Sequence, residues 1–241
     1  MWGSSPCRVC ADSCCAQPPL SPRSKEYRLR MALLSKEAIV KYEKAVGHSK
    51  IADVHFNLGH CYFIIEKYDF AISHYISALK IKKNQAKDEY YYYLACALIV
   101  VGRYNDAITA LKCAIKINCK KGVYYYKLAN VWLEIEKYSK VIKCIEKAEL
   151  LFGQEENDYT KSDLNFLRFK AYVKLPTVNF EVCEKLILSL LKEDENNVNY
   201  LEQYGLLLES VQKNEEAKNV YTKIVSIDSN NKIALNGLKQ L

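Results

Sequence analysis

Small residues return along this chain at a spacing of about 34 positions, and this is the feature that most restricts its fold. Gly59 is followed 36 positions later by Ala95, and Ala129 follows after a further 34. A weaker copy of the pattern carries Ala171, and a clear one carries Gly205. A period of this length, with helical spacing inside each copy, is typical of stacked helix pairs. The sequence therefore predicts an elongated all-α array with a continuous core.

Each small residue belongs to a set of positions that repeats with it. A second small residue follows twelve positions later, as in Ala71 and Ala107, and a larger residue comes four positions after that. Residues four apart share one face of a helix. We expect the small residues to let the two helices of a pair approach closely, and the larger side chains to fill the space between pairs. The larger residues are Tyr75, Leu111, Ile145, Ile187 and Tyr221.

These residues resemble the tetratricopeptide repeat family, in which a small residue on each helix and an aromatic near the turn define the unit. The resemblance covers roughly residues 35–241. It implies an all-α, right-handed superhelical solenoid of stacked antiparallel helix pairs. The chain departs from the family pattern in one respect, because the proline that often ends a repeat is absent. Near those places stand Lys83, Cys119, Gly153 and Ser229.

The expected organisation follows from the repeats and from composition. Four of the five prolines fall within the first 22 residues, which indicates an irregular tail there. The fourth copy of the repeat is longer than the others, with Pro176 between its two helices. The expected segments are an irregular Cys- and Pro-rich tail (1–22), a basic leading helix or degenerate repeat (23–50), repeats at 52–85, 88–121 and 122–155, a long divergent repeat (157–197), a repeat (198–231) and a C-terminal capping helix (232–241).

Positive charge is concentrated near the N-terminus. The first 50 residues hold nine Lys or Arg against four Asp or Glu, a net charge of +5 out of +7 for the whole chain. A basic contact with membrane or nucleic acid is one interpretation. The solvated outer face of a capping helix is the interpretation we favour, because the aromatic residues of the array do not alternate with Lys or Arg runs. No run of apolar residues is long enough to span a membrane, and we expect a cytoplasmic protein, with a mitochondrial transit peptide as the alternative.

The tail also contains a cluster of cysteines. Cys7 and Cys10 form a C-x-x-C motif, and the vicinal pair Cys14 and Cys15 follows. Four thiolates can bind zinc, but structural zinc sites normally separate two ligand pairs by a folded loop. Lipidation of the vicinal pair is a second alternative. We favour a tail without a metal site, and the sequence leaves modification open.

Common sequence motifs of enzyme active sites are missing from the sequence. It contains no H-E-x-x-H motif, phosphate-binding loop, dinucleotide fingerprint or G-x-S-x-G motif. His55 and His60 are five positions apart and therefore do not share a helical face, while His74 belongs to the other helix of that repeat. We therefore expect a protein that is not an enzyme and that has no cofactor and no metal site.

The resemblance places a ligand groove on the first helix of each pair, on the face turned away from its partner helix. Aromatic residues concentrate there, and no single helical face can bury all of the run Tyr90–Tyr93. The alternative is that some of these aromatics, Tyr91 and Tyr125 especially, are core between adjacent pairs. Asn130 is expected to hydrogen-bond a ligand backbone. The predicted partner-binding residues are Phe56, His60, Phe63, Tyr92, Ile99, Tyr126, Asn130, Leu133 and Tyr172.

This groove predicts a non-catalytic adaptor that binds a peptide segment or helix of another protein. The alternative is a structural subunit of a larger assembly that makes contacts through its ends or convex face. Neither nucleic acid nor a membrane is an expected partner. Family members that hold the acidic C-termini of chaperones use several basic and amide side chains, but the corresponding positions here hold Phe56, His60 and Tyr93, with only Lys127 basic. A chaperone C-terminus of this carboxylate-clamp type is therefore not an expected ligand.

Overall fold

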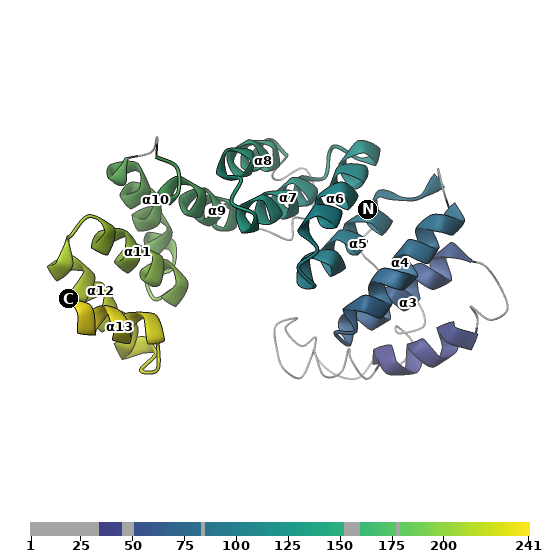
Figure 1. The fold of residues 1–241 in the computed structure, drawn as a ribbon, viewed down its shortest axis with the longest axis horizontal. Coiled ribbons are helices and arrows are strands. Elements are labelled where there is room, and N and C mark those ends of the chain that lie inside the picture. The colour runs from purple at the N-terminus through teal and green to yellow at the C-terminus, as the bar shows by residue number, and fades with distance from the viewer. Residues whose placement is uncertain (1–33, 45–50, 83–84, 152–159, 177–178) are drawn as a thin grey trace. The chain divides into compact units, whose positions relative to one another are not determined.

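The computed structural model describes the chain except for residues 1–33, 45–50, 83–84, 152–159 and 177–178 (Figure 1). The predicted tail, including Cys7, Cys10, Cys14 and Cys15, and the start of the predicted leading helix lie outside the described residues. The described part contains helices and no strand, which confirms the all-α prediction. The helices are a leading helix (34–44), α3 (Ala52–Ile64), α4 (Tyr68–Lys82), α5 (Asp88–Val100), α6 (Tyr104–Ile117), α7 (Gly122–Glu134), α8 (Tyr138–Leu150), α9 (Lys161–Val173), α10 (Phe180–Glu193), α11 (Val198–Ser210), α12 (Asn214–Ile227) and α13 (Lys232–Gln240).

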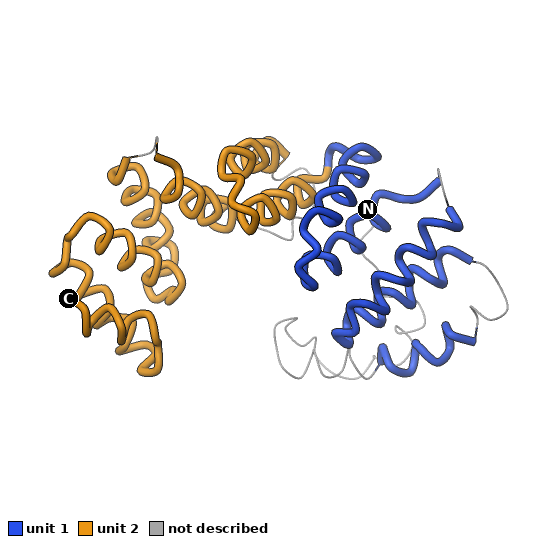
Figure 2. The backbone as a smooth tube through the Cα atoms, in the orientation of Figure 1, with its two compact units in different colours: residues 1–120 blue, residues 121–241 orange. Residues whose placement is uncertain are grey.

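The chain forms two compact units, residues 1–120 and residues 121–241 (Figure 2). In the first unit, α3 packs on α4 and α5 packs on α6, while α4 also packs on α5. In the second unit the pairs are α7 with α8, α9 with α10, and α11 with α12. Here α8 packs on α9, α10 on α11, and α12 on α13. Each unit is therefore a stack of helix pairs.

The turns inside four of the helix pairs share one backbone conformation, with a residue in the left-handed region. In α3/α4 the left-handed residue is Glu66, with a φ of 62°, and its N–H and that of Lys67 bond to carbonyls of the last helical turn. Gly102, Glu136 and Gln212 adopt the same conformation in three other pairs. This Schellman arrangement satisfies carbonyls that the helix end would otherwise leave open. It produces the tight reversal that makes the two helices of a pair antiparallel.

Several helices in the second unit begin with a side-chain cap. The Thr160 hydroxyl accepts from the N–H of Asp163, and the Asp163 carboxylate accepts from the N–H of Thr160, which together form a capping box. Asn179, Asn197 and Asn231 cap α10, α11 and α13. These caps satisfy N–H groups that lack partners inside the helix. They fix where each helix starts.

The repeating positions form the core, as the spacing predicts. All five of the larger residues are fully buried, and the small residues opposite them are buried as well. Gly59 shows why the residue must be small, because a Cβ added there would lie 2.8 Å from the ring of Tyr75. The larger residues are Tyr75, Leu111, Ile145, Ile187 and Tyr221.

In the two tyrosine runs, the residues in the core lie one position before Tyr91 and Tyr125, which the alternative interpretation had named. Tyr90 and Tyr124 are the buried residues, with exposures of 2% and 1%, while Tyr91 and Tyr125 are half-buried. The helical face of α5 explains the shift, because Tyr90 lies one turn before the buried Leu94. Tyr90 also finds a partner for its hydroxyl, which donates to the Asp53 carboxylate on α3.

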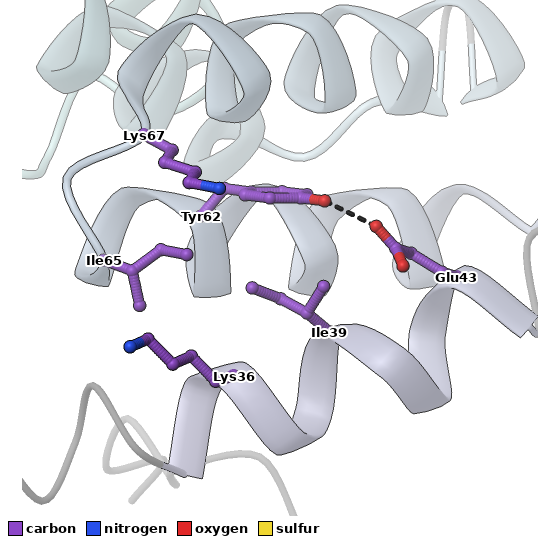
Figure 3. A pocket seen from close by; sticks show the side chains of 6 residues that line it. All are labelled: Lys36, Ile39, Glu43, Tyr62, Ile65 and Lys67. Atoms are coloured by element: carbon purple, nitrogen blue, oxygen red, sulfur yellow. Dashed lines mark hydrogen bonds between the residues drawn. The ribbon is translucent and has the colours of Figure 1, made fainter.

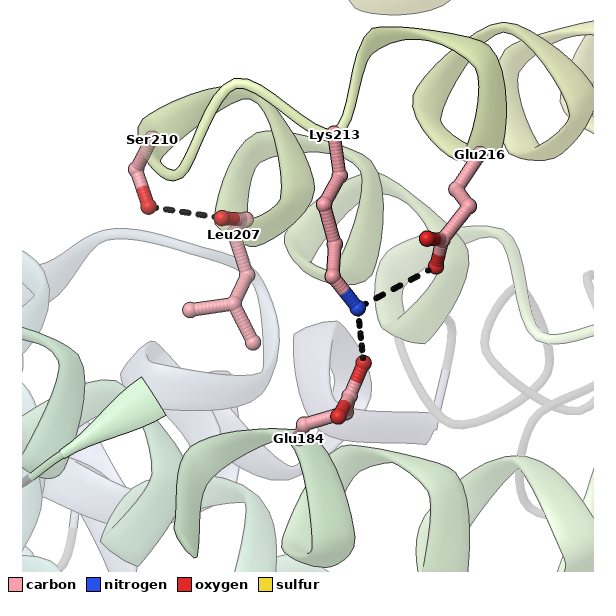
Figure 4. A network of polar contacts seen from close by, with 5 residues as sticks. All are labelled: Glu184, Leu207, Ser210, Lys213 and Glu216. Carbon is pink, nitrogen blue, oxygen red and sulfur yellow. Dashed lines mark hydrogen bonds and ion pairs between the residues drawn. The ribbon is translucent and has the colours of Figure 1, made fainter. Parts of the chain in front are cut away.

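A polar contact joins two helix pairs of the second unit. The Lys213 ammonium, in the turn before α12, lies 3.3 Å from a Glu184 oxygen on α10 and 3.5 Å from Glu216 (Figure 4). The same Nζ lies 4.9 Å from the centre of the Phe180 ring. Beside it, the Ser210 hydroxyl donates to the carbonyl of Leu207 at the end of α11. The contact is partly exposed, so we expect its contribution to stability to be small.

Candidate functional site

All nine predicted partner-binding residues are half-buried. Five lie in the first unit, on α3 and α5, and four lie in the second unit, on α7 and α9. The predicted groove therefore draws on two separate sets of residues. The first set is Phe56, His60, Phe63, Tyr92 and Ile99, and the second is Tyr126, Asn130, Leu133 and Tyr172.

In the first unit, the predicted residues take part in an aromatic cluster between the two helix pairs. The Phe56 ring stacks on that of Tyr90, with centroids 4.5 Å apart, and meets the edge of Tyr93 at 5.6 Å. His60 meets the same Tyr93 ring edge-on at 4.9 Å, and Tyr92 does so at 5.3 Å. Tyr93 is therefore the centre of the cluster, a role that the sequence did not single out.

Two polar atoms of this cluster are buried without a hydrogen-bond partner among the described residues. They are Nδ1 of His60 and the hydroxyl oxygen of Tyr75. Burial lowers the pKa of His60 and raises that of Tyr75, since a charged form would lose its hydration. His60 is therefore held as a neutral side chain packed on Tyr93. His60 therefore serves as a packing residue and is not suited to bind a charged ligand.

Phe63 and Ile99 lie near the C-terminal ends of α3 and α5. Phe63 packs edge-on against Tyr68 of α4, with ring centroids 5.4 Å apart. Both remain half-buried although they are apolar. They extend the partly exposed apolar surface of the first helices beyond the aromatic cluster.

In the second unit, the Asn130 side chain has a hydrogen-bond partner within its own helix. Its side-chain nitrogen donates to the carbonyl of Tyr126 in the same helix, at 2.9 Å. One amide proton is therefore already used, because an asparagine four residues along a helix can reach back to that carbonyl. Burial raises the pKa of the Tyr126 phenol, and Lys127 lies 5.7 Å from its ring centre. Leu133 and Tyr172 are half-buried apolar neighbours on α7 and α9.

A histidine pair that the sequence did not reveal joins α3 to α4. The Nδ1 atoms of His55 and His74 are 3.1 Å apart. The His74 ring also stacks on Tyr62, with centroids 5.5 Å apart and planes 4° from parallel. Nineteen positions separate the two histidines, so no local pattern could have paired them. In the described part of the chain, no group of three or more His, Cys, Asp or Glu side chains is arranged to hold a metal.

A hollow of about 590 Å³ lies between the leading helix and α3 (Figure 3). None of the residues predicted to bind a partner lines it. Sequence patterns do not reveal this site, because its walls come from the leading helix, α3 and the turn after α3, and no motif predicts how these segments pack. The lining residues are Lys36, Ile39, Glu43, Tyr62, Ile65 and Lys67.

No described helix combines the length and the apolar character that a membrane span requires.

Comparison with known proteins agrees with this architecture. Models of the tetratricopeptide repeat match residues 52–85 and 198–231. No curated protein matches the sequence significantly. Many solved structures share the fold, at identities too low to show more than the fold.

Three of these structures illustrate the sequence identity, TM-score and coverage of the matches. YrrB, described as a TPR protein with an unusual peptide-binding site, is 16% identical with a TM-score of 0.63, over 83% of this chain and 98% of YrrB. The APC/C hetero-tetramer Cut9–Hcn1 gives 17% identity and a TM-score of 0.67, over 88% of this chain and 42% of that one. MamA from Desulfovibrio magneticus gives 16% and 0.63, over 75% of this chain and 97% of its own.

The fold suggests a role in protein–protein interaction or as a scaffold, and proteins built in this way are generally non-catalytic modules. Its repeating small and large core residues and its paired helices agree with the two matching models: the chain contains tetratricopeptide repeats at residues 52–85 and 198–231.

Proposed function

We propose that this protein is a non-catalytic adaptor, and that the first helices of the pairs in the first unit bind a peptide segment or helix of a partner protein. The observation that carries the proposal is the set of half-buried apolar side chains on α3 and α5, which includes Phe63, Tyr92 and Ile99. Large apolar residues that stay partly exposed beside one another are typical anchors for a protein ligand.

The structural comparison supports the ligand class. YrrB covers most of this chain and is described as having a peptide-binding site. Helix grooves of this kind accept apolar anchors at helical or extended spacing. The half-buried residues of α7 and α9 are proposed as a separate binding surface of the second unit, with Tyr126 and Tyr172 as its aromatic members.

The proposal is tested with a double variant on the first helices. Affinity capture with the intact protein, followed by mass spectrometry, identifies partners, and calorimetry with the purified partner then measures Kd. Phe63→Ala with Tyr92→Ala should weaken binding by about tenfold or more, since truncation of buried interface aromatics typically costs about 2 kcal/mol.

The matched control is Ile117→Ala at the end of α6, where the side chain is 51% exposed and outside the proposed surface. This control should bind like the intact protein. An unchanged Kd for the double variant with an unchanged melting temperature would remove α3 and α5 from the binding surface. Loss of both binding and folding would assign the two aromatics to the core.

A second candidate function is a structural subunit within a larger assembly. It is favoured by large apolar side chains that are exposed away from the first-helix surface, including Leu150 at 70% and Phe70 at 55%. Cut9–Hcn1, which shares the fold, is described as a hetero-tetramer. Light scattering after size exclusion separates the two functions, because an adaptor should be monomeric without its partner.

We also propose a cytoplasmic location. Cys144 and Cys183 are buried among apolar residues, and burial raises the pKa of both thiols. Such cysteines act as small apolar residues and suit a reducing compartment.

A further inference from the structure

The hollow between the leading helix and α3 has a strongly apolar wall. Ile39 and Tyr62 are each only 8% exposed, and Ile65 is half-buried beside them. The Tyr62 ring also stacks on Phe70, with centroids 5.2 Å apart, and on His74. A ring fixed in this way offers a rigid surface for an apolar side chain.

One end of the hollow carries a carboxylate that is already engaged. The Tyr62 hydroxyl donates to Glu43 across a distance of 2.5 Å (Figure 3). This hydrogen bond, together with burial, raises the pKa of Tyr62 to about 12. The phenol therefore stays protonated at neutral pH and keeps Glu43 as its acceptor.

The other end carries two positive charges. In Figure 3 the Lys36 side chain extends toward Ile65 and the Lys67 side chain toward the Tyr62 ring, and Glu43 lies at the opposite end of that ring. Neither forms an ion pair with a residue that the structure describes. The Lys67 Nζ lies 5.8 Å from the centre of the Phe70 ring. Two ammonium groups beside an apolar wall, neither in an ion pair with a described residue, provide charge-assisted donors for an anion.

We propose that this hollow is a second binding site, which takes an acidic and apolar segment of a partner protein. A carboxylate of the segment lies between Lys36 and Lys67, and a neighbouring apolar side chain packs on Ile39, Ile65 and Tyr62. A volume of about 590 Å³ suits a few residues of peptide, since small-ligand pockets span roughly 300–1,000 Å³. The site shares no residue with the binding surface proposed on α3 and α5. An experiment can therefore reject one of the two proposals without affecting the other.

The probe is a hexapeptide of alternating leucine and glutamate, acetylated at its N-terminus and amidated at its C-terminus so that only side chains carry charge. Binding to the full chain is followed by nitrogen-15 correlation spectra. We expect shifts in the leading helix and at residues 61–68, with smaller or no shifts elsewhere. The same peptide with glutamine in place of glutamate should bind about tenfold more weakly or not at all.

The variant Lys36→Gln with Lys67→Gln should weaken binding of the glutamate peptide by about tenfold. Both lysines are exposed, so folding should be unaffected. The matched control is Lys80→Gln with Lys116→Gln, which removes the same charge from exposed positions outside the hollow and should bind like the intact chain.

Three results would each overturn the proposal. The first is equal binding of the glutamine and glutamate peptides, which would show that no carboxylate is recognised. The second is an equal loss in the control variant, which would show attraction to overall charge. The third is an absence of shifts at the hollow at millimolar peptide, including the case where shifts map to α5.

Discussion

The first two helix pairs of the chain, α3/α4 and α5/α6, use glycine in opposite places. In α3/α4 the glycine is Gly59, inside the contact between the helices, and the left-handed turn residue is Glu66. In α5/α6 the contact residue is Ala95, and the turn residue is Gly102, with a φ of 74°. Both pairs bury their contact positions fully, so the two choices lead to closely packed pairs by different routes.

The difference shows that contact positions across a pair are matched in size. Gly59 faces the Tyr75 ring, whereas Ala95 belongs to the pair whose larger residue is Leu111. Glycine inside a helix costs about 1 kcal/mol relative to alanine, and here the large ring requires it. The pair α11/α12 repeats the arrangement more tightly. A Cβ at either Gly205 or Gly237 would lie within 2.4 Å of the Tyr221 ring.

The largest expected effect comes from breaking this match. Gly59→Ala should destabilise the protein by roughly 1–3 kcal/mol through overpacking, and Tyr75→Leu by a similar amount through a cavity. The double variant reproduces the alanine and leucine of α5/α6. It should therefore lose clearly less than the sum of the two single variants. Urea unfolding of all three measures the coupling.

The matched control is Ala95→Gly in α5/α6. It should cost about 1 kcal/mol, because it adds backbone freedom without relieving a clash. Strictly additive losses for Gly59→Ala and Tyr75→Leu would mean that the two residues are not matched in size.

A smaller effect is expected at the turns. Gly102→Ala should destabilise by about 1 kcal/mol, because a side chain is disfavoured in the left-handed region. Glu66→Gly should stabilise by up to about 1 kcal/mol by relieving that strain in α3/α4. Thermal and urea unfolding of the two variants measure both signs. A loss of stability for Gly102→Ala with a gain for Glu66→Gly would show that the left-handed backbone conformation decides both effects. A loss of stability in both variants would mean that the Glu66 side chain contributes more stability than its backbone conformation costs.

The smallest effect concerns pH and is confined to α3/α4. His55 and His74 meet there, while the equivalent positions in α5/α6 hold Tyr91 and Ala110. Burial lowers the pKa of both histidines, and His55 lowers that of His74 further, although Glu43 of the leading helix opposes this. The unfolded chain, with histidines near 6.5, therefore binds more protons than the folded one.

Stability from this pair is thus present above a pH of about 6.5 and is lost as the pH falls through the lower folded values. Melting temperatures measured between pH 7.5 and pH 5 should show the decline. His74→Ala, which introduces the residue found at the equivalent position Ala110, should flatten it in part, with the remainder coming from His60, whose pKa burial also lowers. An identical dependence of melting temperature on pH in the variant would show that protonation of His55 and His74 is not coupled to folding.

Much of this architecture can be predicted from the local spacing of small and large residues. The positions of Gly59, Ala95 and their repeats, with large residues sixteen positions later, were sufficient to predict helix pairs and the buried face of each helix. This works because a helix places residues four apart on one face, and a repeat that cannot bury its own face must stack on the next. The candidate groove residues also follow from this register, and all of them lie at half-buried positions.

Contacts between segments far apart in the chain were decided only by the tertiary structure. The sequence by itself determined that one helical face cannot bury all of Tyr90–Tyr93, but the rotation of α5 decided that Tyr90 is the buried one, with its hydroxyl bonded to Asp53 of α3. The His55–His74 pair and the hollow beside Tyr62 likewise depend on how whole helices pack. Helical periodicity specifies a face, whereas the partner of a side chain depends on the angle and distance between two helices, which no local spacing encodes.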